Sequence, residues 1–122
     1  MKIVQPSERE TGFNSETCTV LEHPYEEGAY LSTADITLRG RYPENVHDDK
    51  EMWVRNTAVD ALINVTKGRG EVLRPGEPAE RISADGSVTI PRGEWYALSG
   101  HMTLKYVSSP PWTSEQAKYE EL

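Results

Sequence analysis

A carboxylate and a phenol stand two residues apart in this chain and could work together in proton transfer. Glu94 and Tyr96 would share one face of an extended strand, about 6–7 Å apart, because side chains alternate between the two faces. Either side chain can act as a general acid or base when it reaches a substrate. Nothing in the sequence shows that the two reach the same substrate, so it leaves open whether the protein is an enzyme.

The three histidines are too scattered to predict a metal site. His23 and His47 lie in charged, turn-like surroundings, and His101 follows Gly100 at the start of a strand-like run. Imidazole is the commonest metal ligand in proteins, but no two of these residues form a His-x-His pair. We therefore expect each ring to be exposed or held by a single hydrogen bond. Acidic residues around His47 could bind a cation weakly, although a solvated loop is the simpler interpretation: Asp48, Asp49 and Glu51.

The one cysteine, Cys18, can neither form a disulfide within the chain nor build a metal site by itself. It lies in the run Thr-Cys-Thr-Val-Leu, whose alternation is typical of a strand, so we expect a buried structural thiol. The N-terminus has no apolar run of the kind found in signal peptides. No segment approaches the roughly 20 apolar residues of a membrane span. These features predict a cytoplasmic protein without a membrane partner.

The chain is acidic and of single-domain size. Its 122 residues fit one domain over residues 1–122, whose polar first 15 residues are expected to be loosely ordered or to form an arm. Twenty acidic residues against thirteen basic ones give a formal net charge of -7. A surface of this charge repels phosphate backbones and anionic lipids, so no nucleic-acid partner is expected.

Short apolar runs bounded by turn residues predict an all-β protein. The runs are rich in Val, Ile, Thr, Tyr and Trp, which favour strands. Asp85-Gly86 predicts a tight hairpin turn and Pro75-Gly76 a type II turn, while Gly68-Arg69-Gly70 predicts a bend or bulge between two strands. The expected strands cover residues 18–21, 29–38, 58–66, 87–90, 95–98 and 103–107.

Helical patterns are thin, and one strand shows which of its faces is apolar. The best helical candidates are a turn in the tail, with Thr113 as its cap and Gln116 reaching back, and a single turn over residues 50–54.

Alternation over 59–66 places four apolar side chains on one face, which would line the interior: Val59, Ala61, Ile63 and Val65. Many short strands of this kind favour a sandwich, a jelly roll or a small barrel.

Two segments resemble the paired motifs of the cupin family. Residues 55–70 resemble the first motif, in which two histidines and a glutamate precede a strand that ends in Gly-x-Gly. Residues 85–96 resemble the second motif, a turn and an apolar strand followed by Pro-x-Gly-x-x-His. The likeness runs from about residue 30 to the C-terminus. It implies a short, single-domain cupin with a double-stranded β-helix (jelly-roll barrel) and, since cupin barrels commonly pair through their sheets, a homodimer.

The metal ligands of the cupin motifs are missing from these segments. The glutamate position falls on Ala61 and the last histidine position on Tyr96, while Arg55 and Asn56 stand near the first two histidine positions. Arginine is always a cation and opposes a divalent metal. A shift of the register by one residue would instead turn Asp60 inward. The resemblance therefore implies a degenerate site that holds no metal and no cofactor.

An enclosed space with a few hydrogen-bonding groups is the usual form of a small-molecule site. Aromatic walls would suit sugar faces or planar ligands, and Arg55 or Arg41 could pair with a carboxylate or phosphate through its planar fork. Each aromatic side chain could equally pack in the core or at an interface. The residues predicted to bind a ligand are Tyr96, Asn56, Arg55, Trp53, Tyr42 and Tyr106.

Three hypotheses follow for function. The first is a metal-independent barrel that binds a small polar metabolite, such as a sugar derivative. The second is a metal-dependent isomerase or dioxygenase of the cupin type, with ligands among His47, His101, Asp60 and Glu94. The third is a structural or regulatory barrel that acts through protein contacts, with a filled interior and with Trp95 or Trp112 exposed at an interface.

Overall fold

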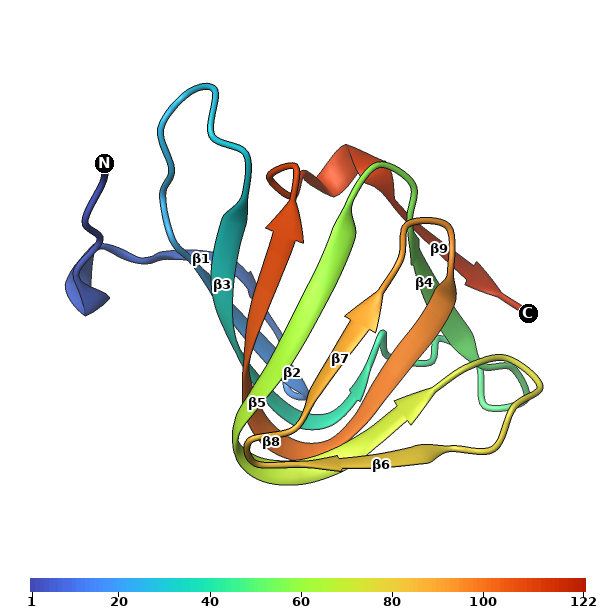
Figure 1. The fold of residues 1–122 in the computed structure, drawn as a ribbon. Coiled ribbons are helices and arrows are strands. Elements are labelled where there is room, and N and C mark those ends of the chain that lie inside the picture. Colours follow the sequence, from blue (N-terminus) through green and yellow to red (C-terminus); the bar gives the residue numbers. More distant parts are fainter.

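The computed structural model describes residues 1–122, and nearly all of its regular structure is β-strand (Figure 1). The nine strands belong to one antiparallel sheet. They are β1 (Glu10–Asn14), β2 (Cys18–Glu22), β3 (Ser32–Tyr42), β4 (Met52–Asn56), β5 (Asp60–Leu73), β6 (Glu80–Ser83), β7 (Ser87–Ile90), β8 (Trp95–Ser109) and β9 (Ala117–Glu121). Two three-residue 3-10 helices complete the chain, η1 (Pro6–Glu8) and η2 (Ser114–Gln116). No helix is long and apolar enough to cross a membrane.

The long strand β8 is the centre of the sheet. It pairs with β3 along one edge and with β5 along the other, and its first residues also pair with β4. Beyond β3 the sheet continues through β2 to β1, and beyond β4 it ends at β9. Strands β6 and β7 both pair with β5. The sheet curls on itself, so that one face is turned inward (Figure 1).

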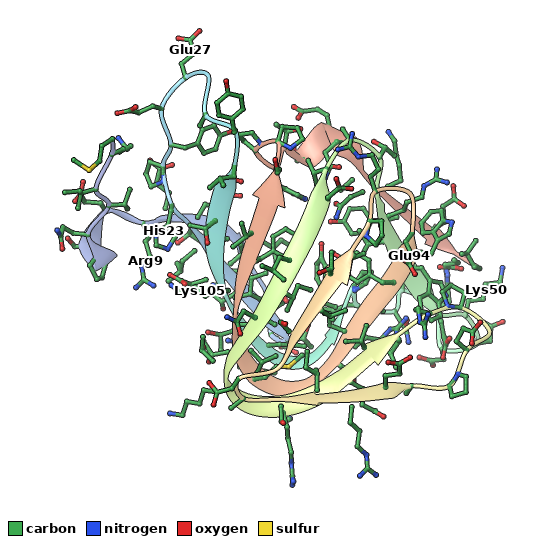
Figure 2. All side chains as sticks on the ribbon, viewed as in Figure 1. Arg9, His23, Glu27, Lys50, Glu94 and Lys105 are labelled. Carbon is green, nitrogen blue, oxygen red and sulfur yellow. The ribbon has the colours of Figure 1, made fainter.

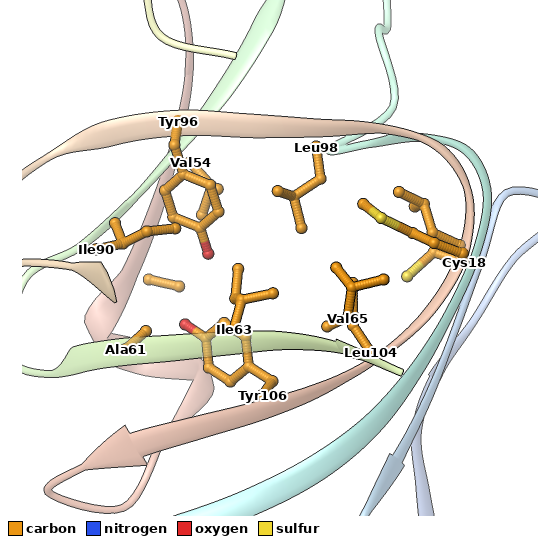
Figure 3. Close-up of a cluster of buried hydrophobic side chains, with 13 residues drawn as sticks. Cys18, Val54, Ala61, Ile63, Val65, Ile90, Tyr96, Leu98, Leu104 and Tyr106 are labelled. Carbon is orange, nitrogen blue, oxygen red and sulfur yellow. The ribbon is translucent and has the colours of Figure 1, made fainter. Parts of the chain in front are cut away.

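A bend at a row of glycines makes this curl possible. Gly40 of β3, Gly100 of β8 and Gly70 of β5 lie side by side across the three strands. Gly100 has φ +134°, and a Cβ there would lie 2.5 Å from the Cα of Gly70. Only glycine accepts that approach and that backbone conformation. The bend turns β8 back, so that its early residue Tyr96 and its later residue Tyr106 face each other (Figure 3).

The predicted bend near Gly68 is present, but it does not end a strand. Gly68 has φ +82°, and the pairing of β5 with β8 shifts register between Val65 and Lys67. Strand β5 nevertheless continues through the irregularity to Leu73. The predicted strands 95–98 and 103–107 are likewise two parts of β8. The prediction divided both strands because glycine normally weakens a strand, whereas here the neighbouring strands support the bend.

The predicted alternation of β5 is confirmed. Val59, Ala61, Ile63 and Val65 are each at most 2% exposed. Leu62, between them, is 41% exposed. Ala61, Ile63 and Val65 join a core that contains side chains from seven strands (Figure 3). No shift of register occurs at Asp60, whose carboxylate is exposed and bonds Arg92.

Both helical predictions are largely wrong, and four strands escaped prediction: β1, β4, β6 and β9. Residues 52–54 belong to β4, which pairs with β9. The tail has a 3-10 turn, but its cap Thr113 makes no side-chain cap bond, and the chain then becomes strand β9. The charged composition of this tail does not predict a strand. Residues 117–121 are extended because they pair with β4, and not because of their own residue preferences.

One turn prediction is confirmed and the other needs correction. In the Pro75-Gly76 turn, the Glu77 amide donates to the Arg74 carbonyl (3.1 Å), and Gly76 has φ +74°. Asp85-Gly86 does form a turn, but the residue with positive φ is Asp85, at 72°, and not the glycine. This turn joins β6 and β7, which pair with β5 and not with each other, so it is no hairpin.

Asp35 attaches the N-terminal segment to the outside of the sheet. Its carboxylate accepts hydrogen bonds from Arg9 (2.7 Å) and bonds His23 Nε2 (2.7 Å) and Lys105. Figure 2 shows Arg9, His23 and Lys105 together beside strand β3. Although burial raises the pKa of Asp35, these hydrogen bonds hold it below the usual range. After this attachment, residues 10–14 pair with β2 as an edge strand.

Candidate functional site

A cavity of about 870 Å³ opens beside the inward face of the sheet. Its lining comes from β1, β2, β3, β4, β8 and β9, from the segments that follow β2 and β3, and from the chain around the start of η2. Half-exposed Phe13 and Tyr25 lie in its lining and mark where it meets solvent. The inner wall contains buried apolar side chains, among them Leu38 and Leu98.

Six residues were predicted to bind a ligand, and four of them line this cavity. They come from three different strands: Tyr42 from β3, Asn56 from β4, and Tyr96 and Tyr106 from β8. Tyr96 and Tyr106 point toward each other from the two arms of bent β8 (Figure 3). The fold thus brings together residues up to 64 positions apart in the chain.

Arg55 and Trp53, the other two predicted residues, do not line the cavity. They alternate on β4 with Val54, a core residue, and with Asn56, so they point to its outer face. The Arg55 guanidinium lies 4.7 Å from the ring centre of Trp95, and Arg41 lies 5.1 Å from that of Trp53. Arg55 Nε is buried without a hydrogen-bond partner. These arginines stack on aromatic rings, and neither lines the cavity.

The side-chain amide of Asn56 is the centre of a buried hydrogen-bond network. The backbone N–H of Ala58 donates to Gln116 Oε1 (3.2 Å), which fixes the Gln116 amide so that its Nε2 donates to Asn56 Oδ1 (2.8 Å). The indole Nε1 of Trp112 donates to the same oxygen (3.3 Å). Because an indole N–H can only donate, both contacts identify this atom as the oxygen. The orientation of the Asn56 amide is therefore determined.

That orientation sets the hydrogen bond to Tyr106. Asn56 Nδ2 donates to the Tyr106 hydroxyl at 2.8 Å. The hydroxyl accepts this bond, and it also forms a hydrogen bond with the Tyr96 hydroxyl. Asn56 is 2% exposed and Tyr106 is 8% exposed, so the whole arrangement is shielded from bulk water. The network therefore holds the Tyr106 phenol in a fixed position in the cavity lining.

Tyr42 and Tyr119 form a second pair of phenols in the cavity lining. The hydroxyl oxygens of Tyr42 and Tyr119 are 2.6 Å apart, and their rings meet edge to face with centroids 6.4 Å apart. Tyr119 and Gln116 were missed as site residues because the pattern of the tail favours a helical turn. A strand over residues 117–121 would have placed Tyr119 opposite Val54 of β4.

Burial raises the pKa of three phenols in the cavity lining. It raises the pKa of Tyr96 and of Tyr42 well above the usual range, and nearby Tyr106 and Tyr119 raise them further. Burial also raises the pKa of Tyr106. At neutral pH these groups are hydrogen-bond donors and acceptors without charge, and they are poor bases.

The predicted acid–base pair does not share this cavity. Glu94 lines a second, smaller cavity of about 430 Å³ between β5, β6 and β7. Tyr96 lines both cavities, whereas Glu94 lines only the smaller one. The spacing of the two residues therefore does not place a carboxylate beside the phenols of the larger cavity.

The side chains of the chain do not fit a metal site. No three His, Cys, Asp or Glu residues lie together in a way that could hold an ion. His23 bonds Asp35, His47 bonds Glu121 at 2.6 Å, and His101 is exposed. At the positions that resemble cupin metal ligands, Asn56, Ala61 and Tyr96 face inward and are buried.

Cys18 is a buried thiol, as predicted. It is 1% exposed, and burial raises its pKa to about 11. The thiolate is the reactive form of cysteine, so this side chain is inert at neutral pH. Cys18 contributes to the apolar wall of the cavity.

Comparison with known proteins relates the chain to solved structures only. No protein-family model and no curated protein matches it. A Streptomyces PAC13 structure with uridine has a TM-score of 0.82 at 13% identity, over 100% of this chain and 92% of that chain. Pac13 is described as a nucleoside dehydratase. KdgF from Halomonas sp. has a TM-score of 0.70 at 13% identity, over 94% of this chain and 97% of that chain.

A domain named as a cupin is also among the similar structures. The cupin domain of Schizosaccharomyces pombe Cnp3 has a TM-score of 0.60 at 15% identity, over 80% of this chain and 69% of that chain. Identities this low show a shared fold and do not transfer an activity. The curled antiparallel sheet and these likenesses agree with the two motif-like segments of the sequence. This chain has the cupin-type fold, an all-β jelly-roll barrel.

Proposed function

We propose that this cupin binds a small polar metabolite with a ring, such as a sugar derivative or a nucleoside, in the 870 Å³ cavity and without a metal. The buried network around Asn56 is the observation that carries the proposal. It presents oriented, uncharged hydrogen-bonding groups beside the apolar side chains of the inner wall. Small-molecule sites combine apolar walls with a few fixed polar groups in this way.

Size and shape support the same function. Ligand pockets commonly have volumes of roughly 300–1,000 Å³, a range that includes this cavity. Phenol and indole rings line it, and such rings pack well against sugar faces and planar bases. Among the structures of similar fold, Pac13 was solved with uridine.

The two alternative functions have less support. A metal-dependent isomerase or dioxygenase would need ligands, and no suitable group of His, Cys, Asp or Glu side chains exists. A structural barrel would have a filled interior and exposed tryptophans. Here Trp112 faces the cavity and Trp95 is covered by Arg55.

A ligand screen tests the proposal. Nucleosides and sugars are added to the purified protein in a thermal-shift assay, and compounds that raise Tm are then titrated by calorimetry. We expect Tyr96→Phe to weaken such a ligand by about tenfold, because one hydrogen bond is lost. Tyr30→Phe, an 87% exposed residue outside the cavity, is the matched control. If no compound of either class binds, the proposal fails.

Elemental analysis tests metal independence separately. Protein purified without chelator should contain far less than one Mn, Fe, Ni, Zn or Cu ion per chain, and chelator should leave ligand binding unchanged. A stoichiometric transition metal would favour the metalloenzyme instead.

We further expect a cytoplasmic homodimer. Strands β1 and β9 each pair with a neighbour on one side only, and an uncovered sheet edge tends to be protected by another chain. Sedimentation analysis would give the mass of the particle, and a monomer at all concentrations would contradict this expectation.

A further inference from the structure

The residues with full charge around the cavity have one sign. Its lining includes Glu10, Glu22 and Glu44, and it includes no lysine and no arginine. Glu10 and Glu44 are exposed and Glu22 is partly buried, so they lie toward the solvent side of the lining. Their carboxylates make the solvent side of the lining negatively charged.

Glu44 is held in its ionised form. Thr17 Oγ1 donates to Glu44 Oε1 at 2.6 Å. Hydrogen bonds from Ser15 and Thr17 lower the pKa of Glu44 below its usual range. This carboxylate therefore keeps its negative charge throughout the neutral range.

His23 is the one histidine in the lining, and its imidazole already bonds the Asp35 carboxylate. His23 Nε2 lies 2.7 Å from Asp35 Oδ2, where Arg9 also bonds. The nearby Arg39 bonds Ser15 O and Thr19 Oγ1, and Arg41 stacks on Trp53. Neither arginine lines the cavity. No free cation is thus available to a bound anion.

The inner wall offers neutral groups in place of cations. The Asn56 amide and the cavity phenols can bond hydroxyls, carbonyls or ring nitrogens. A phosphate carries about -1.5 to -2 charges at neutral pH. Moving such a charge out of water without a partner is strongly unfavourable, and the glutamates repel it as well.

From these charges we infer that the cavity selects uncharged, hydroxyl-bearing ring compounds and rejects their phosphorylated or carboxylated forms. The inference rests on the binding function proposed above and adds the class of ligand. It replaces the prediction that Arg55 or Arg41 pairs with a ligand carboxylate or phosphate, since both side chains lie outside the cavity.

Matched ligand pairs test the inference. Uridine is compared with uridine 5′-monophosphate, and ribose with ribose 5-phosphate, by calorimetry at low and at high salt. We expect the neutral member to bind at least about tenfold more tightly at low salt, with a smaller difference at high salt because salt screens repulsion. Equal or tighter binding of the phosphorylated member would overturn the inference and leave the binding function intact.

A triple variant shows whether the lining causes the selection. The variant combines Glu10→Gln, Glu22→Gln and Glu44→Gln. It should reduce the difference in affinity between the neutral and the phosphorylated member of each ligand pair. The control changes three exposed glutamates outside the lining, Glu71→Gln, Glu77→Gln and Glu120→Gln, and alters net charge equally. If both variants behave alike, overall charge and not the cavity makes the selection, and the inference fails.

Trp112 reports the cavity charge without any ligand. Trp53 and Trp95 also fluoresce but lie outside the cavity lining. The fluorescence of Trp112 is therefore obtained by subtracting the signal of the Trp112→Phe variant from that of the natural protein. The quenching constant of each quencher is divided by its value for free N-acetyltryptophanamide. For Trp112 this ratio should be several-fold smaller for anionic iodide than for neutral acrylamide. Iodide quenching as strong as that by acrylamide would overturn the inference even if no ligand pair binds.

Discussion

Asn56 is the residue on which the inner wall of the cavity depends. Its oxygen accepts two hydrogen bonds and its nitrogen donates one, all inside the barrel. Gln116 of η2 and Tyr106 of β8 each make one of these bonds. A substitution at Asn56 therefore removes a contact to both elements. A buried polar network of this kind is stable only while all members are satisfied.

We predict that Asn56→Ala lowers the free energy of unfolding by about 2–4 kcal/mol, because buried Gln116 and Tyr106 and half-buried Trp112 each lose a hydrogen-bond partner. Urea denaturation measures the change. Asn64→Ala, on the exposed face of β5, should cost less than about 0.5 kcal/mol. An effect at Asn56 as small as that at Asn64 would show that the network adds little stability.

At the residue scale the motif-like segments predicted part of the site. Counting along them identified Asn56 and Tyr96, which both face inward. The same counting could not separate Asn56 from its neighbour Arg55, because adjacent residues on a strand point to opposite faces. Only the pairing of β4 with β8 and β9 decides which face is inner.

At the scale of elements, the bend in β8 decides what the site contains. Tyr96 and Tyr106 lie ten positions apart on one strand, and a straight strand would separate them by about 33 Å. The turn at Gly100 places them opposite each other (Figure 3). Gly70 and Gly40 on the flanking strands allow the three backbones to bend together.

We predict that Gly100→Ala destabilises the fold by about 3 kcal/mol or more, since a Cβ would clash with Gly70 as well as strain the backbone. Gly28→Ala is the matched control. Gly28 also has a positive φ, of +80°, but no atom lies within 4 Å of the added Cβ, so about 1 kcal/mol is expected. Thermal unfolding monitored by circular dichroism compares the two, and equal losses would contradict a steric role for the bend.

For the whole molecule, the buried phenols connect stability to pH. The folded protein keeps the protons of Tyr42, Tyr96 and Tyr106 above pH 10, where the unfolded chain releases them. The folded state then binds more protons than the unfolded state, so the free energy of unfolding falls as the pH rises.

We predict that these three tyrosines titrate only as the chain unfolds. The ultraviolet absorbance of tyrosinate, followed as the pH is raised, should show a late component that coincides with the loss of the circular dichroism signal. In denaturant the same protein should lack the late component. Complete tyrosinate absorbance before unfolding would show that solvent reaches the cavity phenols without disrupting the fold.

The sequence by itself determined the fold class and one inner surface. Period-two alternation over 59–66 requires a strand with one buried face, whatever its partners are. Turn residues such as Pro75-Gly76 act through their own backbone preferences. The absence of the histidines and the glutamate from the cupin-like segments is likewise a property of the amino-acid order alone.

Tertiary structure alone decided what depends on distant pairing. Strand β9 exists because β4 lies beside it, although its own residues favour no strand. The contact of Tyr42 with Tyr119 joins residues 77 positions apart, and the acidic lining combines side chains from β1, β2 and the segment after β3. Local sequence determines which side chains share a face, but long-range strand pairing determines which faces enclose the same cavity.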